Sequence, residues 1–252
     1  MHSSLATKQN KRVNPTLETL MNAKNSFELY DAEIEEFFQQ NYIYHGVLHR
    51  RDRFASISSF GRKAVIYIHR GRIKNYITNP NGQEVFLGFL PQYSTITTLR
   101  SGNDLGKSMV ANTDCSFYVS TSDSYFKFLA SSPKLIEHQI LEPYYRRNLN
   151  DLPKNETMFY PAQIKVYEYV LYLAILFSTP KPEGDPSTTV NFPPSVKDTA
   201  SYLGIHRSNA SRFFSELEEQ GFIDHSTKSI RVHNIFELSK KIEQLKQSHV
   251  TK

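Results

Sequence analysis

The spacing of apolar residues differs between regions of this chain of 252 residues, and the difference limits the folds open to it. From about residue 42 to residue 122, apolar and polar residues alternate in short runs, which is typical of β-strands. From Ser124 onward, apolar residues recur at intervals of three and four, which is the period of an α-helix. Because these strand-like runs stand together and do not alternate with helices, the pattern predicts an α+β protein with a separate β domain.

The β domain is predicted from runs of β-branched and aromatic residues that turn residues separate. The pair Asn81-Gly82 stands between two of these runs and is the strongest hairpin signal in the chain. Short strands at this spacing with no helices between them favour an antiparallel barrel or jelly roll, here called the β-roll. The clearest runs are 64–69, 73–78, 85–90 and 115–119.

Three helices are predicted next to this domain: one before it and two after it. Residues 31–40 fit a short amphipathic helix, and residues 162–177 fit a buried one. Between about 131 and 160, apolar residues form more than one stripe, as in a helix that packs against both its own domain and a partner. Pro143 and Pro153 lie within this long helix, and each is expected to kink or break it.

A later segment has the pattern of a helix-turn-helix. Ser195, with Asp198 three residues on, predicts the start of a helix, and Gly204 predicts a tight turn after it. Small side chains at Ala200 and Ala210 would let the two helices approach each other closely.

The second helix and the residues after it complete this motif. From about residue 207 to 220, apolar residues fall at i, i+3, i+4 and i+7 and predict a buried face. Two short strands, 222–224 and 229–232, would then form a wing.

The exposed face of the second helix has the composition of a reader of the DNA major groove. It begins with small, hydrogen-bonding and cationic residues, while acids come only later in the helix. Lys228, between the two wing strands, is placed to meet a phosphate. The predicted DNA-binding residues are Arg207, Ser208, Asn209, Ser211, Arg212 and Lys228.

The order of β-roll, long helix and winged helix-turn-helix resembles the Crp/Fnr family of bacterial transcription regulators over roughly residues 30–235. Residues 70–74 and 79–90 resemble the sensor hairpin of that family, and Ser211-Arg212 matches the common end of its reading motif. The resemblance implies a homodimer that binds double-stranded DNA and is joined through the long helices, with RNA polymerase as a candidate partner. The expected division is a flexible arm (1–26), a β-roll sensor domain (27–130), a dimerisation helix kinked at its prolines (131–160) and a winged helix-turn-helix DNA-binding domain (161–252).

The chain departs from two branches of that family. The stretch 92–109 lacks the Gly-Glu and Arg-Ser pairs with which cyclic-nucleotide members hold the phosphate, so cyclic AMP is not expected as the effector. A single cysteine, Cys115, cannot hold the iron–sulfur cluster of another branch. Ser208 stands where many members have glutamate, which predicts a different preferred half-site. The remaining resemblance is to the branch that includes halophenol-responsive regulators and the virulence regulator of Listeria.

A small apolar or aromatic effector, bound in the β-roll, is therefore expected. An aromatic and hydroxyl-rich interior, closed by the long helix, would suit it, and Arg100 or Lys107 would meet an anionic group. The alternative is that the aromatic residues are simply core. The predicted pocket residues are Tyr76, Phe86, Phe89, Tyr93, Tyr144 and Tyr145.

Two other functions stay open on the residues alone. One is a DNA-binding regulator without an effector, controlled by its own abundance. The other is a cupin-like metal enzyme that uses His45, His49 and His69. No acid lies at a matching spacing, and an enzyme would leave the helix-turn-helix unexplained, so we expect no catalysis, no metal site and no cofactor.

Composition limits the cellular setting. The single cysteine excludes a disulfide framework within the chain. The longest apolar run, Val170–Phe177, is far shorter than the roughly 20 residues that a membrane span requires. No secretion signal is visible, so we expect a cytoplasmic protein without membrane contact. The formal net charge of +5 fits a polyanionic partner.

Overall fold

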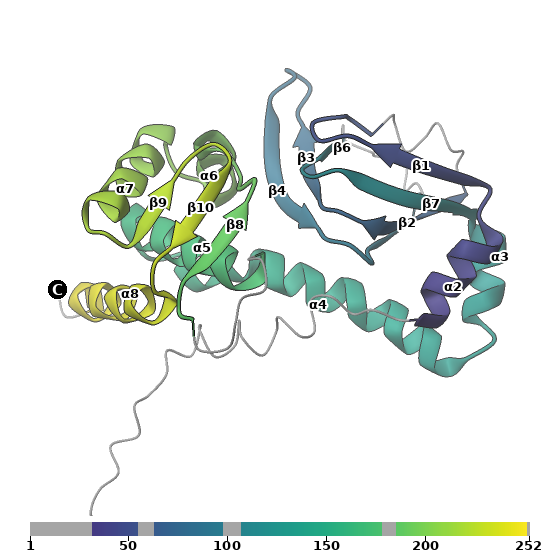
Figure 1. Cartoon of the computed structure of the whole chain (residues 1–252). Coiled ribbons are helices and arrows are strands. Elements are labelled where there is room, and N and C mark those ends of the chain that lie inside the picture. The colour runs from purple at the N-terminus through teal and green to yellow at the C-terminus, as the bar shows by residue number, and fades with distance from the viewer. Residues whose placement is uncertain (1–31, 55–62, 98–106, 178–184, 251–252) are drawn as a thin grey trace, which may run out of the picture.

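The computed structural model describes residues 32–54, 63–97, 107–177 and 185–250. A β-rich part lies at one end and a mixed domain of helices and short strands at the other (Figure 1). A long helix, α4 (Pro133–Thr157), runs from beneath the first part to the second (Figure 1). The predicted α+β class is confirmed.

Two antiparallel sheets form the β-roll, with strand orders β1-β7-β2-β5 and β4-β3-β6. An apolar cluster joins them: it contains Ile66 and Phe117 from the first sheet and Ile73 and Met109 from the second. The strands are β1 (Tyr44–Leu48), β2 (Ala64–Arg70), β3 (Ile73–Thr78), β4 (Glu84–Leu90), β5 (Thr95–Thr97), β6 (Lys107–Ala111) and β7 (Cys115–Thr121).

The predicted hairpin is the pair β3–β4. The Asn79 side-chain oxygen accepts hydrogen bonds from the backbone amides of Asn81 and Gln83, and Gly82 has φ +77°. A positive φ is costly for residues with a Cβ, so this position suits glycine. The hairpin lies on the side of the β-roll that faces the C-terminal domain (Figure 1).

Two helices cover the outer face of the larger sheet, namely α2 (Ala32–Asn41) and α3 (Ser122–Leu129). Phe38 of α2 stacks on Tyr67 of β2, with ring centroids 4.9 Å apart, and also contacts Tyr125 of α3 at 5.2 Å. The amphipathic helix predicted over residues 31–40 is thus confirmed in its described part, and its apolar face is buried.

The helix α4 is continuous, so the break that we considered at Pro143 or Pro153 does not occur. Proline removes one backbone donor, but its fixed φ is helical, so a helix with other contacts can continue through it. Ile136 and Ile140, one turn apart, are 43% and 65% exposed and form an apolar stripe. The structure does not describe the side chains of residues 144–149, and Tyr144 and Tyr145 are among them.

The C-terminal domain has the predicted helices and wing, and it ends in a further helix, α8, that was not predicted. Its sheet has the order β8-β10-β9. Among the described residues, no helix is both long and apolar enough to cross a membrane. The elements are α5 (Ala162–Leu176), β8 (Thr188–Asn191), α6 (Val196–Leu203), α7 (Arg207–Glu219), β9 (Ile223–His225), β10 (Ser229–Val232) and α8 (Ile235–Val250).

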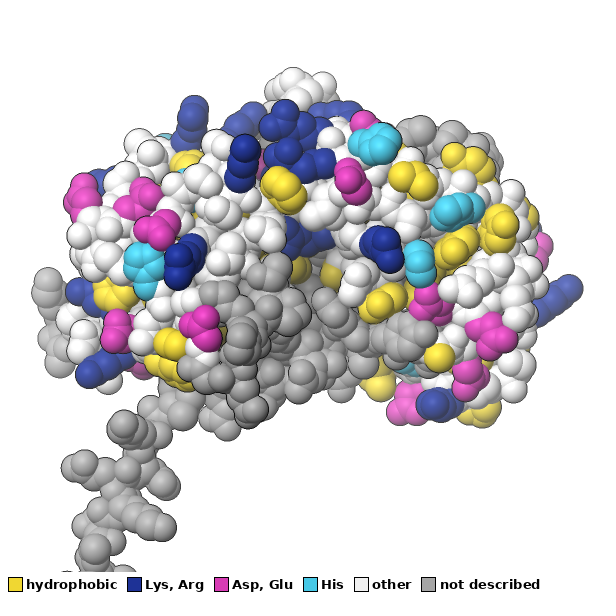
Figure 2. All heavy atoms as spheres, viewed as in Figure 1, with side chains coloured by type: hydrophobic (Ala, Val, Ile, Leu, Met, Phe, Trp, Pro, Cys, Tyr) yellow, Lys and Arg dark blue, Asp and Glu magenta, His cyan; other side chains and the backbone are white. Residues whose placement is uncertain are grey.

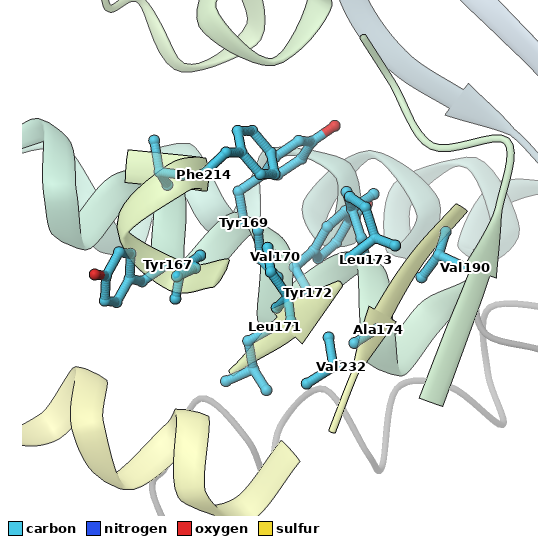
Figure 3. Close-up of a cluster of buried hydrophobic side chains, with 14 of the residues drawn as sticks. Tyr167, Tyr169, Val170, Leu171, Tyr172, Leu173, Ala174, Val190, Phe214 and Val232 are labelled. Atoms are coloured by element: carbon cyan, nitrogen blue, oxygen red, sulfur yellow. The ribbon is translucent and has the colours of Figure 1, made fainter. Parts of the chain in front are cut away.

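The largest apolar cluster extends across both parts of the molecule. Its centre is α5, whose tyrosines and aliphatic residues are shown in Figure 3. Tyr169 of α5 stacks on Tyr202 of α6 at 4.7 Å, and Phe86 of β4 lies 6.0 Å from the same Tyr202 ring. The β3–β4 hairpin and the C-terminal domain therefore share one core, here called the junction core.

Candidate nucleic-acid interface

The turn between α6 and α7 has the geometry that its sequence predicts. Ser195 and Asp198 form both hydrogen bonds of a capping box at the start of α6. Gly204 ends that helix with φ +63°, and the Ile205 amide donates to the Ala200 carbonyl. Because Gly204 adopts the left-handed conformation, the chain can turn directly into α7.

The inner face of α7 is fully packed. Ala210 and Leu217 are 0% exposed, Phe214 is 2% exposed and Phe213 is 6% exposed. The four residues follow the predicted i, i+3, i+4, i+7 spacing, so the helix has a fixed rotation about its axis. The opposite face is consequently directed to solvent.

That outer face carries the predicted DNA-binding residues of α7. Arg207, Ser208, Ser211 and Arg212 are exposed, whereas Asn209 is half-buried. The first turn of α7 contains no acidic residue, and its N-cap, His206, makes no side-chain capping bond. The N-terminal amides and the positive end of the helix dipole are therefore compatible with a nearby phosphate.

Arg212 has local partners in the free chain. Its Nε lies 3.7 Å from Glu216 Oε1, and its guanidinium lies 4.5 Å from the Phe213 ring centroid. The side chain is still 62% exposed. An exposed ion pair of this kind contributes about 0.3–0.5 kcal/mol, so it is easily exchanged for a stronger contact.

The wing consists of β9, β10 and the turn between them. Ser226 closes this turn, since its hydroxyl accepts from the amides of Lys228 and Ser229. Lys228 is exposed at the tip. Glu218 of α7 accepts from the His225 amide at 2.9 Å, so the wing is tied to the helix beside it.

A third strand, β8, was not predicted. It pairs with β10, with Val190 opposite Ile230, and the Phe192 amide just after it donates to the Lys228 carbonyl. The segment 179–186 before this strand is rich in proline and glycine, as in a linker, and most of it lies outside the described residues.

The four predicted pocket residues whose side chains the structure describes do not form one group. Tyr76, Phe86 and Phe89 lie in the junction core and are 9%, 1% and 1% exposed. Tyr93 lies on the other side of the β-roll and packs with the cluster of α2 and α3, 6.5 Å from Tyr67. Arg100 falls outside the described residues. The burial of the first three agrees with the alternative that these aromatic residues are core.

The histidines considered for a metal enzyme contact other side chains, and His45 and His69 share one neighbour, the Tyr118 ring. His45 stacks on Tyr118 at 4.8 Å, His49 lies 3.9 Å from Asp114, and His69 lies 2.9 Å from Glu35. Within the described ranges, no group of three or more His, Cys, Asp or Glu residues could hold a metal ion.

The single cysteine is buried in the apolar cluster between the two sheets of the β-roll. Cys115 is 2% exposed, and burial raises its pKa. A raised pKa keeps the sulfur protonated, and the thiol is less reactive than the thiolate.

Comparison with known proteins agrees with this arrangement. Residues 165–241 match the Crp-like helix-turn-helix domain. A search of curated protein sequences found no match. Three solved structures share the fold at low sequence identity.

The first is a variant of CprK in complex with OCPA: identity is 19%, 84% of this chain and 94% of that chain are covered, and the TM-score is 0.60. The second is a CooA mutant from Carboxydothermus hydrogenoformans, with 14% identity, 88% and 95% coverage and a TM-score of 0.61. The third is a transcriptional regulator of the CRP family from Thermus thermophilus, with 12% identity, 79% and 96% coverage and a TM-score of 0.60. Residues 165–241 are thus a Crp-like helix-turn-helix domain, and the chain as a whole has the fold of the Crp/Fnr regulators that its sequence resembles.

Proposed function

We propose that this protein is a transcription regulator that binds specific DNA sites through α7 and the wing. The observation that carries the proposal is the outer face of α7: its first turns are exposed, small or cationic, and free of acids. Such a face fits the major groove, where arginine can bind guanine with two hydrogen bonds and serine can bind any base. A protein that acts on chromosomal DNA in this way would work in the cytoplasm and would not need to be an enzyme.

The roles of the predicted residues follow from their positions. Arg212 and Ser211 lie on the exposed face of α7 and would contact base edges, together with Ser208. Arg207 at the start of the helix and Lys228 at the tip of the wing would contact phosphates. Asn209 is half-buried, so its contribution to base contacts should be smaller.

We also propose that the protein binds as a homodimer through α4. Ile136 and Ile140 form an exposed apolar stripe on this helix, and burial against a second copy would remove it from water. Two copies related by a two-fold axis would read a pseudo-palindrome whose half-sites are about 34 Å, or one helical turn, apart. RNA polymerase is a candidate partner at such a site.

An effector of the β-roll would have a direct route to the DNA-binding domain. The hairpin residues Tyr76, Phe86 and Phe89 share the junction core with α5 and α6, so a ligand that repacks them would also move the helix-turn-helix. A ligand shifts such an equilibrium only through its different affinity for the two states, typically by about 1–3 kcal/mol. Control by protein abundance alone is the alternative.

The experiment that tests the proposal is selection of duplex sites from a random library with the purified full-length protein. We expect enrichment of a pseudo-palindrome, a dimer in sedimentation at micromolar concentration, and loss of preference at one base pair per half-site with Arg212→Ala. Recovery of unrelated sequences, with Arg212→Ala indistinguishable from the native protein, would reject sequence-specific binding.

The same assay, repeated with a panel of metabolites, separates the two modes of control. Cyclic AMP should leave the affinity unchanged. A compound that changes operator affinity about tenfold would support the effector, since tenfold corresponds to about 1.4 kcal/mol. If no compound changes it, control by abundance is the better description.

A further inference from the structure

A basic surface lies beyond the wing, on the β-roll. Figure 2 shows Lys and Arg side chains gathered at the top of the view, over the junction between the two parts of the molecule. The loop after β1 contributes three arginines in four residues. Arg51 is exposed, the Arg53 side chain is 61% exposed, and Arg50 is half-buried.

This loop adjoins the wing through one aromatic residue. Phe192, just after β8, donates its backbone N–H to the carbonyl of Lys228 at 2.7 Å. The guanidinium carbon of Arg50 lies 4.1 Å from the centroid of the Phe192 ring. Phe192 therefore links the backbone at the tip of the wing to the first arginine of the loop, although the two belong to different parts of the chain.

The order of elements places the loop on the far side of the wing from α7. Phe214 of α7 stacks on His225 of β9 at 4.7 Å, so α7 flanks that strand. The sheet order β8-β10-β9 puts β8, and Phe192 after it, at the other edge. Neighbouring strands are about 4.8 Å apart, so β8 is about 10 Å from β9, or roughly three base pairs along a duplex, and the loop lies beyond β8.

Three acidic residues in or beside the loop accept hydrogen bonds from the loop itself. Glu84 pairs with Arg53, with oxygen–nitrogen distances of 2.8 and 3.2 Å. Asp52 accepts from the His49 amide, and Asp114 accepts from the Arg50 amide, each at 2.8 Å. Because Arg53 is already paired, Arg50 and Arg51 are the side chains suited to an additional anion.

We propose that Arg50 and Arg51 bind phosphates of the DNA that flanks each half-site, so that the β-roll is itself part of the DNA-binding surface. This inference rests on the proposed function, because it requires that a duplex lie on α7 and the wing. A duplex held there and continuing past β8 meets this loop next. Contacts to phosphates are independent of sequence, so they add affinity and salt dependence without changing the preferred site.

The test compares two duplexes that contain the same selected site. The short one ends about two base pairs outside the half-sites, and the long one extends about ten base pairs, one helical turn, further on each side. The double variant Arg50→Gln/Arg51→Gln keeps part of each side-chain stem but removes both charges. Lys127→Gln is the matched control, because Lys127 is an exposed cation on α3 at the far end of the β-roll.

On the long duplex, the double variant should bind about fivefold more weakly, and the slope of log K against log salt should fall by about 0.9 for each lost contact. On the short duplex, its affinity should equal that of the native protein. Lys127→Gln should behave as the native protein on both.

Equal losses on both duplexes would overturn the proposal, because the arginines would then act through the fold or the wing. No loss on either would also overturn it. Arg212→Ala, measured beside them, separates this result from failure of the proposed function: if Arg212→Ala weakens binding and the loop variant does not, only the flanking contact is wrong.

Discussion

The helix-turn-helix meets the β-roll on one face and solvent on the other, and the two faces differ in chemistry. On the face toward the β-roll, Lys74 Nζ lies 2.9 Å from Asp198 Oδ2, and both side chains are at most 15% exposed. The Tyr202 hydroxyl donates to the Asn150 carbonyl on α4, and the Asn150 amide donates to the Phe89 carbonyl. On the solvent face, by contrast, the predicted DNA-binding residues have few contacts within the chain.

Arg72 illustrates how many contacts a side chain makes on the inner face. Its guanidinium donates to the Asn191 carbonyl and lies 4.6 Å and 5.0 Å from the ring centroids of Phe89 and Phe177. Burial lowers its pKa to about 10. The side chain remains charged at neutral pH, so its cost of burial has to be offset by these contacts.

The difference between the two faces suggests that they have different roles in this domain. Buried aromatic packing and paired polar groups fix the position of α6 relative to the hairpin. The outer face of α7 keeps its side chains available for a partner. Substitutions on the inner face should therefore change stability, whereas those on the outer face should change DNA affinity.

The largest effect is expected at Tyr202. This residue is 3% exposed and contacts rings of both α5 and β4, so Tyr202→Ala should lower the free energy of unfolding by about 3–5 kcal/mol. Tyr202→Phe is the matched control, because it keeps the ring and loses the hydroxyl bond to Asn150. It should cost about 1 kcal/mol in the same urea unfolding experiment. Equal costs for the two variants would show that the ring packing matters less than we infer.

The ion pair between the β-roll and α6 should have the next largest effect. Lys74→Met removes the charge but keeps the aliphatic stem, and it leaves Asp198 largely buried without its cation. We expect a loss of about 2–3 kcal/mol. A double-mutant cycle with Asp198→Asn isolates the pair from the role of Asp198 in the capping box. A coupling energy near zero would mean that the junction does not depend on this contact.

These two predictions concern the region that the sequence described least well. Tyr76 and Phe86 of the hairpin are more than 100 residues from Tyr202 along the chain. An aromatic residue on a strand is also equally suited to the inside of a β-roll. The amino-acid pattern therefore grouped Tyr93 with them, although the structure places it with α2 and α3. Likewise, the residues of β8 do not show the apolar spacing of a strand, and they form one because β10 pairs with them.

The helix-turn-helix was predictable because its constraints are local. The capping box of Ser195 and Asp198, the positive φ of Gly204 and the apolar spacing around Ala210 all act within about one turn of helix or one connection. The residues that bind DNA follow from which face those constraints expose. Their individual roles stay predictions.

On the outer face, Arg212→Ala should leave stability unchanged within about 0.5 kcal/mol, because the residue is exposed. It should reduce affinity for the best operator by about 1–3 kcal/mol and relax the preference at one base pair of each half-site. Lys228→Ala should instead weaken binding to all sequences and reduce the salt slope by about 0.9. Fluorescence anisotropy with matched and mutated operators distinguishes the two. Similar, sequence-independent losses for both variants would contradict their assignment to base and phosphate contacts.

The smallest effect is expected from two histidines beside the wing, and their pKa values should move in opposite directions. His233 Nε2 lies 2.9 Å from Asp224 Oδ2, and its Nδ1 lies 2.8 Å from the Gly221 carbonyl. The bond to Asp224 raises the pKa of His233 above its usual 6.5, with Arg231 acting weakly against it. His225, stacked on Phe214, has its pKa lowered because burial disfavours the charged ring.

The sign of each contribution to stability follows. Protonated His233 contributes its full stabilisation below pH 6.5, and this contribution is lost as the pH rises through the raised pKa of His233. Neutral His225 contributes its stabilisation above pH 6.5, and this contribution is lost as the pH falls through the lowered pKa of His225. Because the side chain of His233 is 40% exposed, solvent screening should keep its effect below about 0.5 kcal/mol. NMR titration of the imidazole signals, assigned with His233→Gln and His225→Gln, measures both values directly. If the pKa of His233 were lower than that of His225, the outer edge of the wing would have to be more tightly packed than its inner edge. That result would contradict the contrast between the buried and open faces of this domain.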